Sequence, residues 1–402
     1  MQKIDSTRHL TASYSLMQSL YWILDVALLA YVTPFLEERG YSSMQIGVIN
    51  ACKFTAMIIF QYALGVYADR HIDRASIKKI LTFLTLGALL ATSTLTFAPN
   101  RFAIVIVCFM AIGMMVNSLL TMLESLSIQY LQTGEKLHYS FSRAVASFVY
   151  SLGCIVMGIF TERWNVEFAV RFAIPVLAIF LIGNVLMPGV NREKLSAINR
   201  KIGENVHSAG HLIRYYPKYR WFLIECFLML TGFNLNIAFL IDRVRELGGG
   251  NRIFGILMAV IGFAEIPTAL LFQRLLNHFS IQTMMFVMSI FNSLRAIGTS
   301  FATSSFGIVG VQLFEAGGMA LYYPGAVYFI MQYVPVNDSV KGTSFLNIAG
   351  FGVSQVVSAV LSGLIMQNFG LQSLMNISNI CTLLAVEAGL IMLKVPRENS
   401  LY

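Results

Sequence analysis

Charged residues are scarce in this sequence. Asp, Glu, Lys and Arg make up 12% of its 402 residues, about half of their share in a typical soluble domain. Apolar residues make up 56%, and apolar runs of about twenty residues, long enough to cross a bilayer as helices, recur from end to end. Alternation of apolar and polar residues is absent, which excludes a membrane barrel. An all-α membrane protein is indicated, because backbone groups in lipid must bond within their own helix.

Twelve such runs predict twelve transmembrane helices. We place them at 12–34, 44–66, 79–98, 102–130, 138–160, 167–188, 219–241, 252–273, 281–302, 306–330, 343–367 and 371–394. The polar first ten residues, and Asp25 inside the first run, indicate a retained helix rather than a cleaved signal peptide. We therefore expect a multi-pass protein of the cell membrane, plasma or inner.

The sequence also lacks the motifs of common enzymes and metal sites. It contains no Gly-Lys-Thr phosphate loop, no GxSxG and no HExxH, so neither nucleotide hydrolysis nor common hydrolytic chemistry is indicated. The five cysteines lie in apolar spans at unrelated spacings and are interpreted as small buried hydrophobes. His207 and His211 have no third ligand nearby. We expect no enzyme activity, no catalytic or metal site, and no cofactor.

Lys and Arg are divided unevenly between the two sets of connections. With the N-terminus inside, eighteen of them fall in cytoplasmic segments and seven in the opposite loops, which is the bias of the positive-inside rule. Both termini are therefore expected in the cytoplasm. The net charge of +8 is then mostly a topology signal, and no nucleic-acid partner is expected.

The longest polar interruption covers residues 189–218, and every other connection is short. It predicts an N-terminal six-helix bundle over 1–188, a basic cytoplasmic linker over 189–218 and a C-terminal six-helix bundle over 219–402. Two bundles joined in this way are the architecture of transporters that rock one half against the other.

Seven ionisable side chains lie deep inside the apolar runs. A charge at bilayer depth costs about 2.5–3.5 kcal/mol on insertion scales, so such residues are retained where they face a protein interior or a watery cavity. They outline a polar path through the membrane, which favours transport. The seven are Asp25, Lys53, Glu124, Arg143, Glu265, Arg295 and Glu315.

The loop after the second span resembles the signature of the major facilitator superfamily: a glycine, then aspartate and arginine, then further basic residues. Gly65 is expected to let two helices approach closely. Asp69 is placed to receive a helix N-terminus or a basic side chain, and with Arg70 and Arg74 it forms a conformational motif. The usual second glycine of the signature is Ile72 here.

Four passages resemble the lactose-permease-like branch of that superfamily, which includes proton-coupled sugar, nucleoside and aromatic-acid symporters. They are Glu124 with the segment 139–150, the segment 261–265, the segment 293–304, and the segment from Val334 through Lys341 into the eleventh span. Together they cover most of the chain. The segment 293–304 around Arg295 is the most specific match.

The resemblance implies roles for individual residues. Positions matching Glu124 and Arg143 hold sugar hydroxyls, and the aromatic matching Tyr150 stacks on the sugar ring. The acid matching Glu265 contributes to binding and coupling, and the span-nine Arg295 aids proton release. Carboxylates accept from hydroxyls and guanidinium groups donate to them, which suits a polyol. The residues alone leave two alternatives open: Glu124 and Arg143 also fit a salt bridge that staples two helices, and Tyr150 also fits a packing role.

Span ten departs from lactose permease, where a lysine, a histidine and a glutamate follow at successive turns. Here those positions read Gln312, Glu315 and Gly318. The usual coupling carboxylate is therefore missing, and we expect Glu315, near Arg295, to take over its duty.

Asp25 and Lys53 are not typical of the sugar permeases. We expect them to pair with each other or to meet a charged group of the substrate, and we count both as candidate binding residues.

Several further polar residues lie in the C-terminal spans. Asn234 and Asn236 in span seven and Asn347 in span eleven fit cavity contacts and interhelical hydrogen bonds equally well. Glu225 and Glu387 lie nearer the cytoplasmic edge, and we expect them to contact the basic loops.

These interpretations predict a secondary active, proton-coupled symporter that moves a small polar organic solute, a sugar, oligosaccharide or nucleoside, by alternating access. The alternative is a drug/proton antiporter that exports lipophilic or cationic compounds, to which Asp25 and the twenty Met residues point. The expected partners are the small-molecule substrate, protons and the lipid bilayer, and we expect a monomer.

Overall fold

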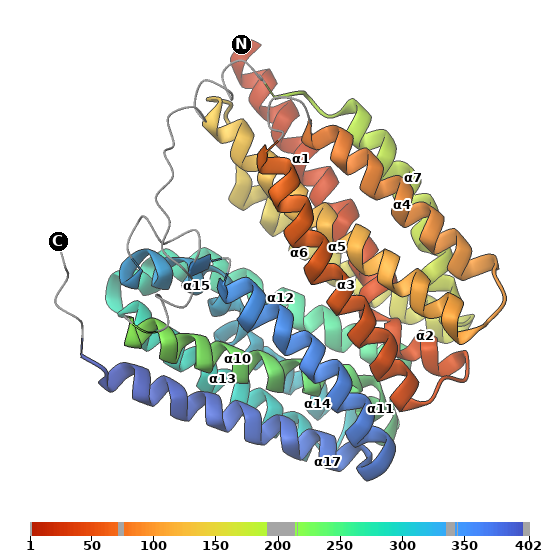
Figure 1. The fold of residues 1–402 in the computed structure, drawn as a ribbon, viewed down its shortest axis with the longest axis vertical. Coiled ribbons are helices and arrows are strands. Elements are labelled where there is room, and N and C mark those ends of the chain that lie inside the picture. Colours follow the sequence, from red (N-terminus) through yellow and green to blue (C-terminus); the bar gives the residue numbers. More distant parts are fainter. Residues whose placement is uncertain are drawn as a thin grey trace. The chain divides into compact units, whose positions relative to one another are not determined.

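The protein is all-helical in the residues that its computed structural model describes, namely 2–70, 76–190, 214, 216–334, 342–343 and 345–396 (Figure 1). Contacts divide the chain into two compact units. The first consists of Met1–Tyr41 and Cys52–Gly203, and the second of Ser42–Ala51 and Glu204–Tyr402. Most of the predicted linker, 189–218, lies outside the described residues, so the predicted domain boundaries stay a prediction.

The first unit is built from long helices joined by short loops. Its elements are α1 (Gln2–Asp25), the π-helical turn η1 (Val26–Ala30), α2 (Val32–Glu38), the part of α3 (Ser43–Arg70) from Cys52 onward, α4 (Ile77–Phe97), α5 (Phe102–Gln132), α6 (Tyr139–Arg163) and α7 (Glu167–Leu186). The start of α3, up to Ala51, belongs to the second unit. Helix α1 packs against α5, α6 and α7, while α4 packs against α5 and α7. Large aromatic side chains such as Tyr14, Phe109 and Phe180 fill the interior.

The second unit contains more interrupted helices. Its elements are α10 (Pro217–Ala238), α11 (Leu240–Glu246), α12 (Asn251–His278), α13 (Ile281–Phe301), α14 (Ser305–Val311), the 3-10 segment η2 (Gln312–Gly317), α15 (Met319–Tyr333), the π-helical η3 (Leu346–Gly352) and α17 (Val353–Lys394). Helix α17 packs against α10 and α13, and α12 packs against η2 and α15. The core contains Phe222 and Phe329, whose rings stack with centroids 4.0 Å apart.

Breaks in the helices mark where structure and prediction differ and where they agree. The predicted span 306–330 is divided into α14, η2 and α15. The break predicted between the spans 343–367 and 371–394 is present, because α17 consists of two helices that meet at a kink at Gly370 (φ 77°, ψ 178°; Figure 1). Glycine adopts this backbone conformation without strain. The chain therefore turns at this single residue, and the next helix begins directly after it.

Eight of the described helices are long and apolar enough to cross a membrane, and the pair 8–30 and 32–38, bent by 42°, counts as a ninth. The predicted fold class is thus supported as an all-α, multi-pass membrane protein, while the number twelve stays a prediction. Helix α13 is outside the eight because its inner face is polar: Ser289, Asn292, Ser293, Arg295 and Thr299 are all buried.

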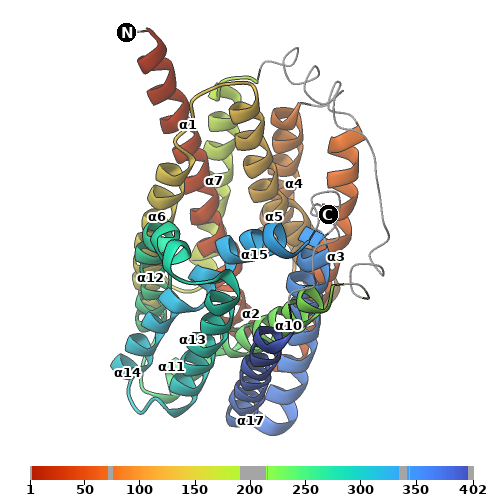
Figure 2. The ribbon, with the colours of Figure 1, turned by 90° about the vertical axis from the view of Figure 1, so that its left-hand side faces the viewer.

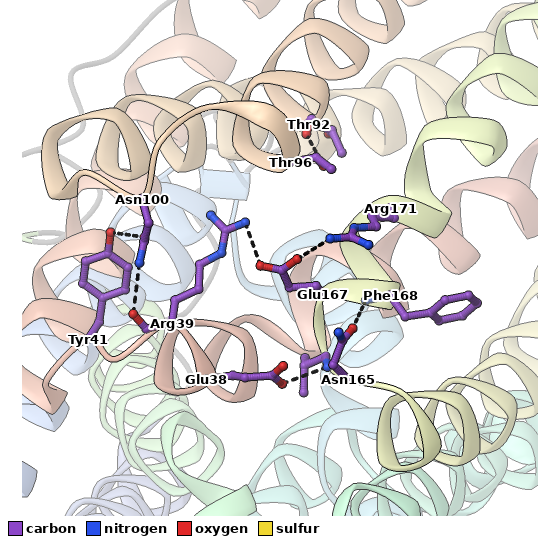
Figure 3. Close-up of polar contacts among 11 residues, drawn as sticks. Glu38, Arg39, Tyr41, Thr92, Thr96, Asn100, Asn165, Glu167, Phe168 and Arg171 are labelled. Carbon is purple, nitrogen blue, oxygen red and sulfur yellow. Dashed lines mark hydrogen bonds and ion pairs between the residues drawn. The ribbon is translucent and has the colours of Figure 1, made fainter.

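A polar network closes one end of the first unit (Figure 3). Glu167 of α7 contacts Arg39 at 3.3 Å and Arg171 at 2.7 Å, and Glu38 accepts a 2.8 Å hydrogen bond from the backbone of Val166. The end of α2 is thereby tied to the start of α7. At the other end, Lys78 of α4 donates to the carbonyl groups of Val185, in the last turn of α7, and of Met187, directly after it.

The helices of each unit lie side by side in both views (Figure 2).

Candidate functional sites

In the first unit, Glu124 of α5 and Arg143 of α6 form an ion pair of 3.8 Å between Oε1 and Nη1. Their side chains are 43% and 27% exposed. The pair is longer than a hydrogen bond and only partly buried, so it contributes little to stability. Both groups keep bonding capacity for a ligand, which favours binding over the alternative of a helix staple.

Aromatic rings surround this ion pair. The Arg143 guanidinium lies 5.3 Å from the Trp22 ring, and Trp22 meets the Tyr150 ring edge-on at 5.5 Å. The Trp22 Nε1 atom is buried without a hydrogen-bond partner among the described residues. Sequence reasoning missed Trp22, because an aromatic residue in an apolar run is usually a packing residue. One feature of the sequence could have indicated Trp22. It lies three residues before Asp25, and residues three apart share a helix face.

Asp25 and Lys53 come close enough for their charges to interact, but they form no direct ion pair. Lys53 is 3% exposed, and its ammonium lies 4.4 Å from the Phe54 ring. A Cβ at Gly113 of α5 would lie 2.6 Å from Lys53 Cγ, so this glycine makes the room that the lysine occupies. The π-helical turn η1 begins directly after Asp25, and such turns are frequent at functional sites.

The two groups of the first unit are neighbours. Tyr150, which contacts Trp22, lies one helical turn before Cys154 on α6, and Cys154 lies within electrostatic reach of Asp25. Five of the residues predicted to bind substrate, Asp25, Lys53, Glu124, Arg143 and Tyr150, therefore belong to one region of the first unit.

In the second unit, Arg295 and Glu315 form a fully buried pair. Their Nη1 and Oε2 atoms are 3.4 Å apart, and each side chain is 1% exposed. Arg295 also donates to Gln312 Oε1 at 3.0 Å, and its guanidinium lies 4.4 Å from the Phe233 ring. The 3-10 segment η2 carries both Gln312 and Glu315 to this arginine. Removing one partner of such a buried pair typically costs about 3–5 kcal/mol.

The other residues predicted in this unit differ in how deeply they are buried. Glu265 is half-buried on α12, and the acid that contacts Arg295 is Glu315. Asn234 is half-buried, and its Nδ2 atom has no partner among the described residues. Asn236 is fully buried against Met375 of α17, which fits the interhelical alternative. Asn347 is exposed.

The prediction that Glu225 contacts basic loops is wrong. Glu225 is 0% exposed, and its Oε1 accepts a 2.6 Å hydrogen bond from Ser289 of α13. Gly389 of α17 makes room for it, since a Cβ there would lie 2.6 Å from Oε1. The reason is helix rotation: position 225 falls on the face of α10 that meets α13 and α17, whereas Glu387 is exposed on α17.

The conformational motif is only partly described. A Cβ at Gly65 would meet no atom within 4 Å in the described part of the chain, so a close helix contact is not seen at this glycine. Asp69 and Arg70 lie in the last turn of α3. Arg74 lies outside the described residues.

Two helical units with inward-facing charges define a multi-pass membrane transporter, and comparison with known proteins agrees. Residues 13–377 match the family model described as "MFS_1 like family", and the chain belongs to this family of major facilitator transporters. Sugar efflux transporter A from Escherichia coli (strain K12) is 24% identical over 344 residues, which are 83% of each chain.

Two solved structures of the nucleoside transporter NupG have the same fold. One, a single-residue mutant, superposes with a TM-score of 0.80 and covers 95% of this chain and 99% of its own. The other has a TM-score of 0.78 and covers 96% and 100%. Both are 12% identical to this chain. The family and these neighbours are transporters rather than enzymes.

Proposed function

We propose that this protein is a secondary transporter that moves a sugar or nucleoside across the cell membrane by alternating access, with protons as the coupling ion. The observation that carries the proposal is the group formed by Glu124, Arg143, Trp22 and Tyr150. The carboxylate accepts hydrogen bonds from sugar hydroxyls and the guanidinium donates to them, while the two aromatic rings match the C–H face of a sugar ring. The solute-related names of the relatives support the same substrate class.

Proton coupling is assigned to the second unit. The pair of Arg295 and Glu315 offers a carboxyl group beside a fixed cation, so a proton can leave Glu315 without leaving an unpaired charge. Glu265, on the neighbouring helix α12, is kept as a coupling residue. Asp69, Arg70 and Arg74, with Gly65, are kept as the conformational motif.

The direction of transport has two candidates. Symport predicts inward movement together with protons. The curated relative is described as an efflux transporter, which favours export in exchange for protons as the second candidate. The drug/proton antiporter has no comparable support, since a partly exposed acid–arginine pair selects polyols rather than lipophilic cations.

The test uses purified protein in lipid vesicles with a pH gradient imposed in either direction. Labelled lactose and labelled uridine serve as probes of the two solute classes. We expect gradient-dependent movement of at least one probe, and the sign of the effective gradient identifies symport or exchange. No movement of either probe in any condition contradicts the proposal.

The site is tested with Glu124→Gln and Arg143→Ala. Each removes a hydrogen bond to a charged group, worth about 1.5–3 kcal/mol, so we expect apparent affinity to fall by about 10- to 100-fold. Arg171→Ala, an exposed arginine at the end of the first unit, is the matched control. Transport that survives in both site variants places the solute elsewhere.

A further inference from the structure

Glu225 is a buried acid that the proposed coupling pair does not use. Its side chain is 0% exposed, one oxygen accepts from Ser289, and Oε2 has no hydrogen-bond partner among the described residues. None of the ion pairs in the described part of the chain includes it. An isolated carboxylate in an apolar interior is costly, so this group is stable there with a proton bound.

In the described part of the chain, the groups that face Glu225 carry no positive charge. Helix α13 contributes Ser289, and α17 contributes the backbone of Gly389. On its own helix the next residue is Cys226, whose thiol interacts with both Glu225 and the Tyr322 hydroxyl of α15.

The nearest basic residue on α10 is Lys218, seven positions earlier. It lies about 10 Å away along the helix axis, and its ammonium lies 5.4 Å from the Tyr333 ring. Neither it nor the weak acids Cys226 and Tyr322 neutralises the carboxylate of Glu225.

Helix α13 carries a row of buried polar side chains from this acid to the coupling pair. Ser289, Asn292, Ser293 and Arg295 are each at most 4% exposed. The six steps from Ser289 to Arg295 span about 9 Å of helix. The Asn292 amide also reaches the turn after η2, where a Cβ at Gly318 would lie 3.1 Å from its Nδ2.

The row is rich in unsatisfied polar atoms. Asn292 Oδ1, Ser293 Oγ and Arg295 Nε have no hydrogen-bond partner among the described residues, as is true of Glu225 Oε2. Buried polar atoms are nearly always satisfied, and bound water with two to four polar partners satisfies such groups in protein interiors. Water bound between these side chains would link them by hydrogen bonds, and such a chain can conduct protons.

We propose that Glu225 is a second proton-carrying carboxyl, connected to Glu315 by the buried polar row of α13. The inference rests on the proposed proton coupling and extends it to a second site. In the transfer, the O–H bond of protonated Glu315 breaks and leaves a carboxylate that Arg295 neutralises. The proton passes along water bound at Ser293 and Asn292 to a Glu225 that has lost its own proton. A new O–H bond forms there and restores the protonated form, which is the stable one in these surroundings. The number of protons and the net charge of the unit are unchanged.

The first experiment needs no solute. Infrared spectra of the purified protein in lipid vesicles at neutral pH report protonated carboxyl groups through their C=O stretch. We expect Glu225→Gln to lose one component of this band, while Glu387→Gln, an exposed acid on α17, keeps it. A band that is identical in the parent protein and in Glu225→Gln overturns the proposal, whatever the transport assays give.

The second experiment separates coupling from solute movement. Labelled lactose and uridine are followed in two assays, accumulation driven by a pH gradient and exchange at equal pH. We expect Glu225→Gln and Asn292→Leu to lose about tenfold or more of the accumulation while exchange, which needs no net proton movement, continues. The matched control Glu387→Gln changes neither assay.

The outcomes separate the proposed second proton site from the proposed proton-coupled transport. Full accumulation in Glu225→Gln overturns the second proton site and leaves the proposed function standing. A parent protein that exchanges solute but accumulates none under either gradient overturns proton coupling itself, and the role of Glu225 with it.

Discussion

Among single residues, Trp22 does most to shape the candidate binding region. Its ring contacts Arg143 and Tyr150, and its indole Nε1 is a buried donor with no partner among the described residues. A tryptophan with an unused donor beside an acid–arginine pair is suited to a ligand that brings both hydroxyls and an apolar face.

Replacing Trp22 with alanine is expected to weaken solute binding. The loss of the cation–π contact and of the ring surface is worth about 0.5–2 kcal/mol, so KM for the transported probe should rise by about 2- to 30-fold. Trp22→Phe keeps a ring and should fall between. Trp164→Ala, at the exposed end of α6, is the control. An unchanged KM in Trp22→Ala assigns the ring to packing.

Gly113 is a second residue whose role becomes testable. A methyl group there meets Lys53 Cγ at 2.6 Å and the Lys53 carbonyl oxygen at 3.0 Å. We expect Gly113→Ala to lower stability by about 1–3 kcal/mol through overpacking, measured by thermal unfolding in detergent. In a Lys53→Ala background the nearer contact is gone, so the same substitution should cost less. Equal costs in the two backgrounds contradict the contact.

At the scale of elements, the long apolar runs locate the helices well and their interruptions poorly. The predictions 102–130 and 167–188 compare with α5 at Phe102–Gln132 and α7 at Glu167–Leu186. The break of 306–330 at η2 was not predicted. Hydropathy measures how a residue partitions into lipid, and it does not register a local change of hydrogen bonding such as the 3-10 segment that carries Glu315.

The turn inside α17 depends on one glycine. Gly370 has φ 77° and ψ 178°, a conformation that costs other residues about 1–3 kcal/mol. Gly370→Ala should therefore lower the thermal unfolding temperature of the protein. Gly310→Ala is the matched control, because no atom lies within 4 Å of a Cβ there and its φ is not positive. Equal effects of the two substitutions argue against strain at Gly370.

At the scale of the whole molecule, the uneven distribution of Lys and Arg makes a prediction about topology. Both termini are expected on the cytoplasmic side, which also requires an even number of spans. Reporter proteins fused to each terminus test this, since phosphatase reporters are active outside and fluorescent ones inside. Termini on opposite sides contradict the predicted twelve spans, and a fusion in the loop at Arg101, expected outside, serves as the control.

The sequence by itself determined the class of the protein and the residues that need an explanation. The cost of a charge in lipid belongs to the residue, so Asp25, Lys53, Glu124, Arg143 and Arg295 stand out without any structure. The sequence also indicated that Glu124 can pair with Arg143 and that Glu315 lies near Arg295, and both contacts are present. Only the tertiary structure decided the contacts that depend on the rotation and register of each helix. It brought Trp22 to Arg143, and it moved Glu225 from the expected loop contacts into the interior beside Ser289.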